Sequence, residues 1–196
     1  MVEIGECMLI RDDDLSFDSD VEHVKTFCEI CDKHGFEIIH AITPIGITHN
    51  IDSSWNNDYI VAQGGKHTLG DNTALLEYLQ TRQDKIGTHG LFHTHKPSLM
   101  DQQVAVSILQ GWGFCPDYAV LPFNEESPEY TDSVLGLKVL GKSQRLEDYL
   151  EKMPKANELP TDDIVYLHEW RFGEGKWYSW DNLDRTLERI KNGGLV

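Results

Sequence analysis

Three short stretches of the sequence hold side chains whose types and spacing suit catalysis or metal binding. The first is RDDD, residues 11–14, in which three aspartates follow an apolar run. A carboxylate can act as a general base or bind a cation, but short acidic side chains also stabilise turns and helix N-termini. The triplet by itself therefore leaves a catalytic and a structural interpretation open.

The second stretch is HGLFH, in which His89 and His93 lie four residues apart at the end of an expected strand. This spacing brings two imidazoles to one side of a helical turn or tight loop, where they can share a divalent cation with a carboxylate from another strand. Gly90 permits the backbone to bend after the strand. His95 is a competing ligand, and a hydrogen-bonded histidine pair that fills a loop is the alternative interpretation.

The third stretch is IVYLH, an apolar run that ends in His168. In β/α folds the C-terminal ends of the strands meet at one face, where active sites form. We therefore expect His168 to lie on the same face as the first two stretches. Taken as a lone residue, it would more often be structural.

An α/β fold must position these stretches, because apolar strand-like runs alternate with helical patterns. Strands are expected over residues 7–12, 37–46, 85–89, 117–122, 134–140 and 163–168. Helices are expected over residues 19–35, 73–83, 100–111, 146–153 and 179–193. Six or seven strands in 196 residues are too few for an eightfold barrel, which takes ~250 residues. We therefore expect one domain, residues 1–196, built as a reduced or distorted (β/α) barrel.

Two other segments have simpler interpretations. The polar segment 48–73 has no convincing period, and loops of this length are usually functional or mobile, so it is a candidate substrate lid. Cys28 and Cys31 follow Val21 and Val24 at the spacing of one helix face. Because no second CxxC completes a zinc site, we expect buried thiols rather than a redox or metal pair.

Composition narrows the class of partner and the location. Acidic residues outnumber basic ones by 33 to 17, and the formal net charge is −16. Such a charge repels phosphate backbones and anionic lipids, so nucleic acid is not expected as a partner. No signal peptide is recognisable, and no run approaches the ~20 apolar residues of a membrane span. Four irregularly spaced cysteines suit a reducing compartment, so a cytoplasmic protein is expected.

In this order, the three stretches resemble the motifs of the NodB-homology polysaccharide deacetylases, carbohydrate esterase family 4. In that family the first strand ends in an aspartate pair, a catalytic base followed by a metal ligand, which Asp13 and Asp14 match. The two metal-binding histidines of the family match His89 and His93. The resemblance covers residues 8–170. It implies a NodB-like fold and one bound divalent metal ion, with zinc as the expected ion.

The last motif of the family is a leucine and a histidine that close a late strand, and Leu167 and His168 match it. The resemblance implies that His168 is the general acid and that Leu167 lines the acetyl pocket. We also expect Trp170, two residues further along the chain, to contact the substrate.

The middle motif of the family is different in this chain. The family has an arginine followed by prolines and a tyrosine, whereas AVLPFNEES offers Pro122, Phe123 and Asn124 without arginine or tyrosine. These three residues are the expected substrate-binding residues of this motif, with a backbone N–H near them to hold the oxyanion.

Arg11 is the candidate to replace the missing arginine, which normally orients the base. The strand period of two places Arg11 and Asp13 on one face and Asp12 on the other, while Asp14 follows as the strand gives way to a loop. We therefore hypothesise that Arg11 acts as a catalytic residue beside Asp13.

The resemblance implies a metal-dependent hydrolase that removes an acetyl group from an N-acetylated sugar or a related acetamide. Such a carbohydrate or small acetamide is the expected partner, nucleotide-linked or lipid-linked rather than an extracellular wall polymer. The alternative is a catalytically silent carbohydrate-binding relative of the same fold. A phosphoesterase or glycosidase is less well supported, because the sequence shows neither the ligands of a two-metal site nor a carboxylate pair spaced across a sugar.

Overall fold

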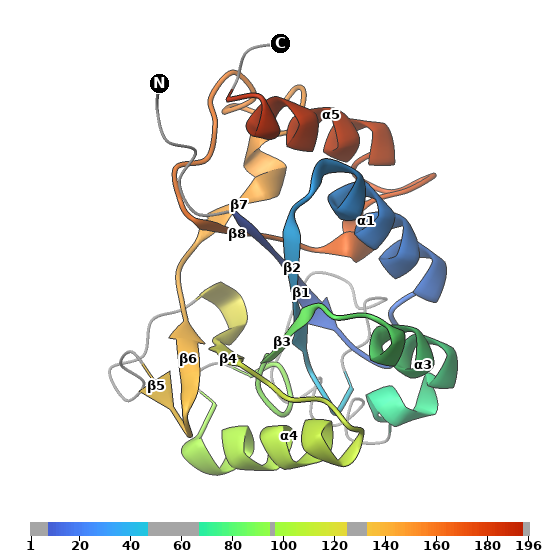
Figure 1. Ribbon diagram of the computed structural model, residues 1–196, viewed down its shortest axis with the longest axis vertical. Helices are drawn as coiled ribbons and strands as arrows, with labels where there is room; N and C mark the ends of the chain where they lie inside the picture. Colours follow the sequence, from blue (N-terminus) through green and yellow to red (C-terminus); the bar gives the residue numbers. More distant parts are fainter. Residues whose placement is uncertain (1–7, 47–66, 95–96, 125–132, 194–196) are drawn as a thin grey trace. The chain divides into compact units, whose positions relative to one another are not determined.

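The computed structural model describes residues 8–46, 67–94, 97–124 and 133–193 (Figure 1). Within these residues one eight-stranded sheet has the order β5-β6-β4-β3-β2-β1-β8-β7. The strands are β1 (Leu9–Leu15), β2 (Glu37–Ile42), β3 (Lys85–Thr88), β4 (Tyr118–Val120), β5 (Ser133–Val134), β6 (Leu137–Leu140), β7 (Gln144–Arg145) and β8 (Ile164–Leu167). The helices are α1 (Val21–His34), α3 (Thr73–Thr81), α4 (Leu99–Gly111) and α5 (Trp180–Lys191). Short 3₁₀ turns are η1 (Leu69–Asp71), η2 (Pro122–Asn124), η3 (Leu146–Tyr149) and η4 (Glu169–Arg171).

The sheet is mixed but mainly parallel. β1 pairs with β8, β3 with β4, β4 with β6 and β7 with β8 in parallel, whereas β5 and β6 are antiparallel. Strands of parallel sheets are usually buried on both faces and apolar. β1 is buried along residues 10–15 although its sequence is LIRDDDL. The fold therefore holds the charged RDDD stretch in its interior.

The chain divides into two compact units, which are described separately. The first unit consists of Met1–Asp12, Glu22–Ile39 and Ser143–Val196, and the second consists of Asp13–Val21 and His40–Lys142. The single domain expected over residues 1–196 stays a prediction.

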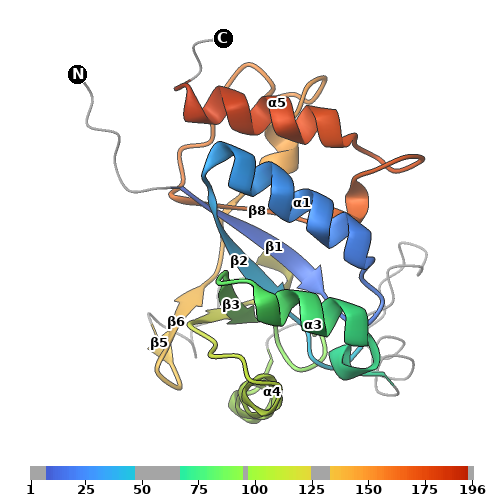
Figure 2. The ribbon, with the colours of Figure 1, turned by 45° about the vertical axis from the view of Figure 1, so that its right-hand side comes forward.

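In the first unit, α1 and α5 lie side by side (Figures 1 and 2). Lys33 Nζ and His34 Nε2, at the end of α1, are each 2.7 Å from an oxygen of Asp184 in α5. Hydrogen bonds from Lys33 and then His34 lower the pKa of Asp184. The inner face of α1 buries Val24, Phe27, Cys28 and Cys31, which confirms the expected buried thiols.

In the second unit, α4 packs against β3, and α3 is tied to the segment that follows β1. Asn72 makes this connection. Its Oδ1 caps α3 by accepting a hydrogen bond of 3.2 Å from the N–H of Leu75. The Asn72 amide also donates to the carbonyls of Phe17 and Ser19, both at 2.9 Å. One capping residue thus begins a helix and holds the chain after β1.

Two predicted elements take a different form in the structure. The strand expected over 134–140 is a hairpin of β5 and β6, because Leu135 and Gly136 have positive φ angles of 53° and 81° and reverse the chain. The helix expected over 146–153 is only the turn η3, after which Leu150 is extended. The apolar spacing that predicted this helix is satisfied by one turn, which already buries Leu146 and Tyr149.

The other predicted elements are confirmed within a few residues at each end. β1 runs past its expected end at residue 12 to Leu15. β7 was not predicted, since two residues are too few to show a strand period. The described residues therefore contain eight strands rather than six or seven. Residues 48–66 of the expected lid, and His95, lie outside the described residues.

Candidate functional site

The residues of the RDDD stretch are all buried in β1. Arg11, Asp12, Asp13 and Asp14 are each at most 3% exposed. Burying a charged side chain is unfavourable unless the charge is paired, hydrogen-bonded or bound to a metal. The partners of these side chains are therefore the best guide to their roles.

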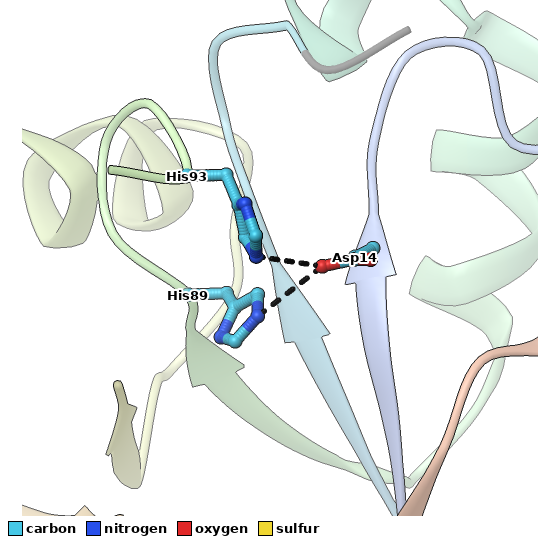
Figure 3. A group of neighbouring side chains, drawn as sticks. All are labelled: Asp14, His89 and His93. Carbon is cyan, nitrogen blue, oxygen red and sulfur yellow. Dashed lines mark ion pairs between the residues drawn. The ribbon is translucent and has the colours of Figure 1, made fainter. Parts of the chain in front are cut away.

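Asp14, His89 and His93 form one cluster within the second unit (Figure 3). Asp14 lies near the C-terminal end of β1, His89 directly follows β3, and His93 lies on the loop beyond it. Asp14 Oδ1 is 3.3 Å from His89 Nε2 and 3.0 Å from His93 Nε2. All three side chains are buried. The expected metal ligands are thus brought together by the fold.

Backbone groups set the orientation of His89. Its main-chain N–H donates to the carbonyl of Ile42 at 2.7 Å, and its Nδ1 lies 3.3 Å from the carbonyl oxygen of Val120. A carbonyl oxygen only accepts hydrogen bonds, so Nδ1 is the donor of this contact, and in a neutral ring Nε2 is then the nitrogen that can bind a cation. Metal-binding histidines are commonly oriented through the second ring nitrogen in this way.

Left-handed backbone conformations help to bring the ligands together. Asp14 has a φ of 72°, which is uncommon for a residue other than glycine. Gly90 has a φ of 78°, and a Cβ at this position would lie 3.3 Å from Cγ of Pro122. Conformations of this kind often occur at functional sites, where the surrounding structure holds them in place. Gly90 provides the bend between His89 and His93 that its position in the sequence predicted.

The ligand atoms of this cluster suit a divalent cation. They all lie within 4.8 Å of one another. Two imidazole nitrogens and one carboxylate oxygen are typical of metal sites that keep positions open for water or substrate. The group can therefore hold a metal ion. The other arrangement that these distances allow is an ion pair between Asp14 and a protonated histidine.

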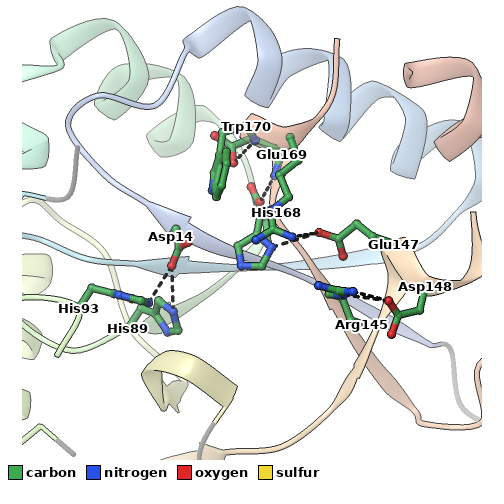
Figure 4. A network of polar contacts seen from close by, with 11 residues as sticks. Asp14, His89, His93, Arg145, Glu147, Asp148, His168, Glu169 and Trp170 are labelled. Atoms are coloured by element: carbon green, nitrogen blue, oxygen red, sulfur yellow. Dashed lines mark hydrogen bonds and ion pairs between the residues drawn. The ribbon is translucent and has the colours of Figure 1, made fainter. Parts of the chain in front are cut away.

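A second histidine and carboxylate cluster lies within the first unit (Figure 4). His168 Nδ1 is 3.1 Å from Oε1 of Glu147 in η3, and Arg171 Nη1 is 3.8 Å from the same oxygen. Because an ionised carboxylate only accepts hydrogen bonds, Nδ1 carries the proton and Nε2 is left for another partner. This arrangement orients an imidazole for proton transfer through Nε2.

Glu147 was missed by reasoning from the sequence. It lies 21 residues before His168, in a stretch where a helix was expected and where a glutamate would ordinarily face solvent. In the structure Glu147 is fully buried, and its Oε2 has no hydrogen-bond partner among the described residues. An unsatisfied buried polar atom costs about 1–3 kcal/mol. A buried carboxylate with this free-energy cost indicates a role for Glu147 beside His168.

Arg11 and Asp12 have partners in the region of β8. Arg11 pairs in register with Tyr166, and its guanidinium lies 5.1 Å from the centroid of the Tyr166 ring. Asp12 Oδ1 accepts a hydrogen bond of 3.1 Å from the main-chain N–H of Glu169. Asp12 thus anchors the turn after β8. The catalytic roles expected for Arg11 and Asp13 stay predictions.

The expected substrate-binding residues lie in both units. In the second unit, η2 contains Pro122, Phe123 and Asn124, and the last two have positive φ angles of 61° and 54°. The Phe123 ring lies 4.4 Å from the ring of His93, measured between centroids, so η2 packs against the cluster of Asp14, His89 and His93.

In the first unit, Leu167 is fully buried in β8. The Trp170 ring in η4 lies 5.6 Å from the His168 ring, measured between centroids. The contacts of Leu167 and Trp170 to substrate stay predictions.

None of the helices in the described part of the chain is long and apolar enough to cross a membrane.

No protein-family model and no curated protein match the sequence, but solved structures share its fold. Peptidoglycan deacetylase PdaC from Bacillus subtilis is 12% identical with a TM-score of 0.61, over 97% of this chain and 86% of that protein. A family 4 acetyl xylan esterase from Clostridium thermocellum, in complex with a cobalt ion, is 16% identical with a TM-score of 0.59, over 96% of this chain and 84% of that protein. BA3943 from Bacillus anthracis, a family 4 pseudoenzyme, is 11% identical with a TM-score of 0.62, over 97% of this chain and 62% of that protein.

At these identities the likeness shows the fold, while chemistry must be argued from the residues of this chain. The predicted fold class and the resemblance stated from the sequence agree with these neighbours. This chain therefore has the α/β, distorted β/α-barrel, NodB-like fold of the carbohydrate esterase family 4 deacetylases.

Proposed function

We propose that this protein is a metal-dependent hydrolase that removes an acetyl group from an N-acetylated sugar or a related acetamide. The observation that carries the proposal is the buried group of Asp14, His89 and His93, in which Nε2 of both histidines faces the same oxygen of Asp14. A buried pair of imidazoles facing one carboxylate oxygen is the donor set of an open divalent metal site.

A bound divalent ion, with zinc as the first candidate, would lower the pKa of a water molecule and polarise the acetamide carbonyl. Asp13 would take up the proton of the attacking water as general base. Arg11 would orient the Asp13 carboxylate, in place of the arginine that the middle motif lacks.

The remaining roles concern the leaving group and the oxyanion. His168 would protonate the leaving amine through Nε2, because its Nδ1 proton is held by Glu147. The main-chain N–H groups near Phe123 and Asn124 would stabilise the oxyanion. Leu167 would line the acetyl pocket, and Pro122 and Trp170 would contact the substrate.

The named neighbours support the class of substrate. PdaC is a peptidoglycan deacetylase and the Clostridium thermocellum protein is an acetyl xylan esterase, so this fold hosts removal of acetyl groups from glycans. The cobalt ion in the esterase structure supports a metal-dependent reaction. We carry both properties to this chain as parts of the proposal. The cytoplasmic location stays a prediction from the sequence.

A catalytically silent carbohydrate-binding protein is the second candidate. It is favoured by the absence of arginine and tyrosine from the stretch around Pro122. It is also supported by BA3943, because a protein of this fold is a pseudoenzyme whose mutant has restored enzymatic activity. A mutation can therefore restore activity to a silent protein of this fold.

The experiment that tests the proposal uses two neighbouring aspartates as a matched pair. Purified protein is loaded with zinc or cobalt, and metal content and acetate release from N-acetylglucosamine oligomers and aryl acetamides are measured. Asp13→Asn should keep the metal and lose about 100- to 10,000-fold in acetate release, as expected for a lost general base. Asp14→Asn should lose metal, and added metal should restore part of any activity left.

The outcomes separate the two candidate functions. Metal binding without acetate release from any acetamide tried would favour the silent carbohydrate-binding protein. Equal metal content in wild type and Asp14→Asn would contradict the metal site. If Asp12→Asn loses metal instead, the ligand has been assigned to the wrong aspartate.

A further inference from the structure

His168 and Arg171 meet at one oxygen of a buried carboxylate in the first unit. His168 Nδ1 lies 3.1 Å from Oε1 of Glu147 (Figure 4), and Arg171 Nη1 lies 3.8 Å from the same atom. The shorter contact is a hydrogen bond, whereas the longer one lies outside hydrogen-bond range and acts through charge alone. One fully buried carboxylate is thus shared by an imidazole and a guanidinium.

The turn η4 brings Arg171 back to His168. The main-chain N–H of Arg171 donates to the carbonyl of His168 at 3.1 Å. Side chains three residues apart lie on the same side of a 3₁₀ turn, so this spacing places both side chains beside one carboxylate. The main-chain N–H of Tyr178 donates to the carbonyl of Arg171 at 3.1 Å, which ties the turn to the chain that follows.

Two indole rings hold the guanidinium of Arg171. It lies 4.9 Å from the ring centroid of Trp170 and 5.0 Å from that of Trp177. Cation–π contacts of this kind favour a charged group over the face of a ring. Trp177 is 71% exposed, whereas the Arg171 side chain is only 16% exposed. The guanidinium is therefore a fixed charge shielded from bulk water, and solvent screens its field at Glu147 only weakly.

Arg145 and Asp148 form a separate ion pair close to this group. Arg145 Nε donates to Oδ1 of Asp148 at 3.0 Å. Burial lowers the pKa of Arg145, but its hydrogen bond to Asp148 outweighs burial and raises the pKa. The opposite charges of the pair largely offset each other at a distance, so their combined effect on the proton of His168 is small.

Arg11 and two tyrosines also lie in this part of the first unit. The Tyr166 ring lies 5.7 Å from the His168 ring, measured between centroids, and the Arg11 guanidinium lies 5.1 Å from the centroid of the same tyrosine. Burial and then the charge of Glu147 raise the pKa of Tyr178, so this phenol is neutral at neutral pH. The cation placed on the oxygen that His168 bonds is Arg171.

Glu147 and Arg171 act on the proton of His168 in opposite directions. A carboxylate stabilises a charged imidazole beside it, whereas a nearby guanidinium disfavours the charged ring. When His168 is neutral, Arg171 balances the charge of the buried carboxylate. Without Arg171, loss of the proton would leave Glu147 without that balancing charge, so His168 would hold its proton to higher pH. An acid that holds its proton too tightly is a poor donor at neutral pH.

We propose that Arg171 is a positioning residue that acts through Glu147 to set the pH at which His168 releases its proton. The consequence for catalysis rests on the proposed deacetylase function, in which His168 protonates the leaving amine. The effect on the titration of His168 needs neither substrate nor turnover. Trp170 and Trp177 keep the guanidinium where it exerts this effect.

The test follows the imidazole signal of His168 by NMR during a pH titration of ¹⁵N-labelled protein with zinc present. Its absence in His168→Gln assigns the signal. Arg171→Met removes the charge but keeps an unbranched side chain between the indoles, and it should raise the midpoint of the titration by about one pH unit. Arg171→Lys keeps the charge and should return the midpoint most of the way to the wild-type value.

Arg185→Met is the matched control, because Arg185 forms an exposed ion pair with Glu151 and the variant removes the same charge from the chain. It should leave the midpoint unchanged. In the enzyme, the pH above which acetate release falls should rise by about one pH unit in Arg171→Met but not in Arg185→Met, with equal metal content in both.

The outcomes distinguish this inference from the proposed function. An unchanged or lowered midpoint in Arg171→Met, with an intact circular dichroism spectrum, would overturn the role of Arg171 even if acetate is released. A raised midpoint in a protein that releases no acetate would support this role and contradict the enzyme. An equal rise in Arg185→Met would overturn the role, since net charge alone would then explain it. If Arg171→Met does not fold, Arg171→Gln, which is also neutral, provides the same measurement.

Discussion

The cluster of Asp14, His89 and His93 and the cluster of His168 and Glu147 pair histidine with a carboxylate in opposite ways. In the cluster of the second unit, one oxygen of Asp14 faces the Nε2 atoms of His89 and His93. In the cluster of the first unit, Glu147 holds Nδ1 of a single histidine, His168. The difference lies in which ring nitrogen meets the carboxylate and in how many rings share it.

This difference determines what each cluster can do. A backbone carbonyl accepts a hydrogen bond from Nδ1 of His89, so Nε2 faces the carboxylate of Asp14, an arrangement that suits a cation. At His168 the carboxylate itself accepts the hydrogen bond from Nδ1, which leaves Nε2 to donate or accept a proton. The same two residue types therefore favour metal binding in one region and proton transfer in the other.

The largest effect is expected when a ligand of the second-unit cluster is removed. His89→Ala should lower metal affinity by more than about 100-fold, since even outer partners of ligands contribute 10- to 100-fold. Acetate release should be lost with the metal. Metal content by plasma mass spectrometry and acetate release measure both effects, and His67→Ala, which removes an exposed histidine, is the control. Stoichiometric metal in a His89→Ala/His93→Ala double variant would contradict the assignment of these histidines as metal ligands.

Removal of His168 should reduce acetate release without affecting the metal. We expect His168→Ala to lose about 100- to 10,000-fold on acetamides, the usual contribution of a general acid. The loss should be smaller on an activated aryl ester, whose leaving group needs no proton. Kinetics on both substrates, with metal content measured in parallel, check this expectation. An equal loss on ester and acetamide would show that His168 has some other role.

A smaller effect is expected at Glu147. Glu147→Gln keeps the shape and an acceptor oxygen for Nδ1 of His168 but removes the charge. The step from a charged to a neutral hydrogen bond is worth about 1–1.5 kcal/mol, or about 10-fold in turnover.

Asp148→Asn is the control for Glu147→Gln, because Asp148 carries its own ion pair with Arg145. Acetate release and metal content are compared in both variants. Equal turnover in Glu147→Gln and wild type would show that the charge of Glu147 has no part in the reaction and that its role is structural.

The pair of His40 and Asp84 serves as a structural reference. In the second unit, Asp84 Oδ2 lies 3.0 Å from Nε2 of the buried His40, and Asp84 also pairs with Arg82. Burial raises the pKa of Asp84, but the hydrogen bonds from His40 and Arg82 outweigh it and lower the pKa from 3.8 to about 2. A lowered pKa in the folded state stabilises the fold above the unfolded value, and this gain is lost as the pH falls through the folded value.

Asp84→Asn should therefore lower the free energy of unfolding by about 2 kcal/mol at neutral pH. The difference from wild type should shrink between about pH 4 and pH 2, which urea unfolding at several pH values measures. Metal content and acetate release per folded protein should not change. A variant that loses metal would show that His40 and Asp84 themselves help to hold an ion, since their ligand atoms also lie close enough together to do so.

The proximity of Asp14, His89 and His93 could be predicted largely from the sequence, because the signals for it are local. The four-residue spacing of His89 and His93, with Gly90 between them, fits a bend directly after a strand. The first and last stretches were expected at the ends of strands, where β1 and β8 hold them next to each other in register. Failures occurred where a turn replaced a regular element, as at η3, because a single turn buries the same apolar residues as a longer helix.

The sequence by itself determined the α/β class, the order of the motifs and the residue types that are able to bind a cation or transfer a proton, because these follow from period, spacing and side-chain chemistry. Only the tertiary structure decided that Glu147 holds His168 and that the carbonyl of Val120 orients His89. It alone placed the exposed Trp177 on Arg171. The reason is physical: a carboxylate or carbonyl far along the chain becomes a hydrogen-bond partner only when packing brings it within about 3 Å, and no local pattern encodes that approach.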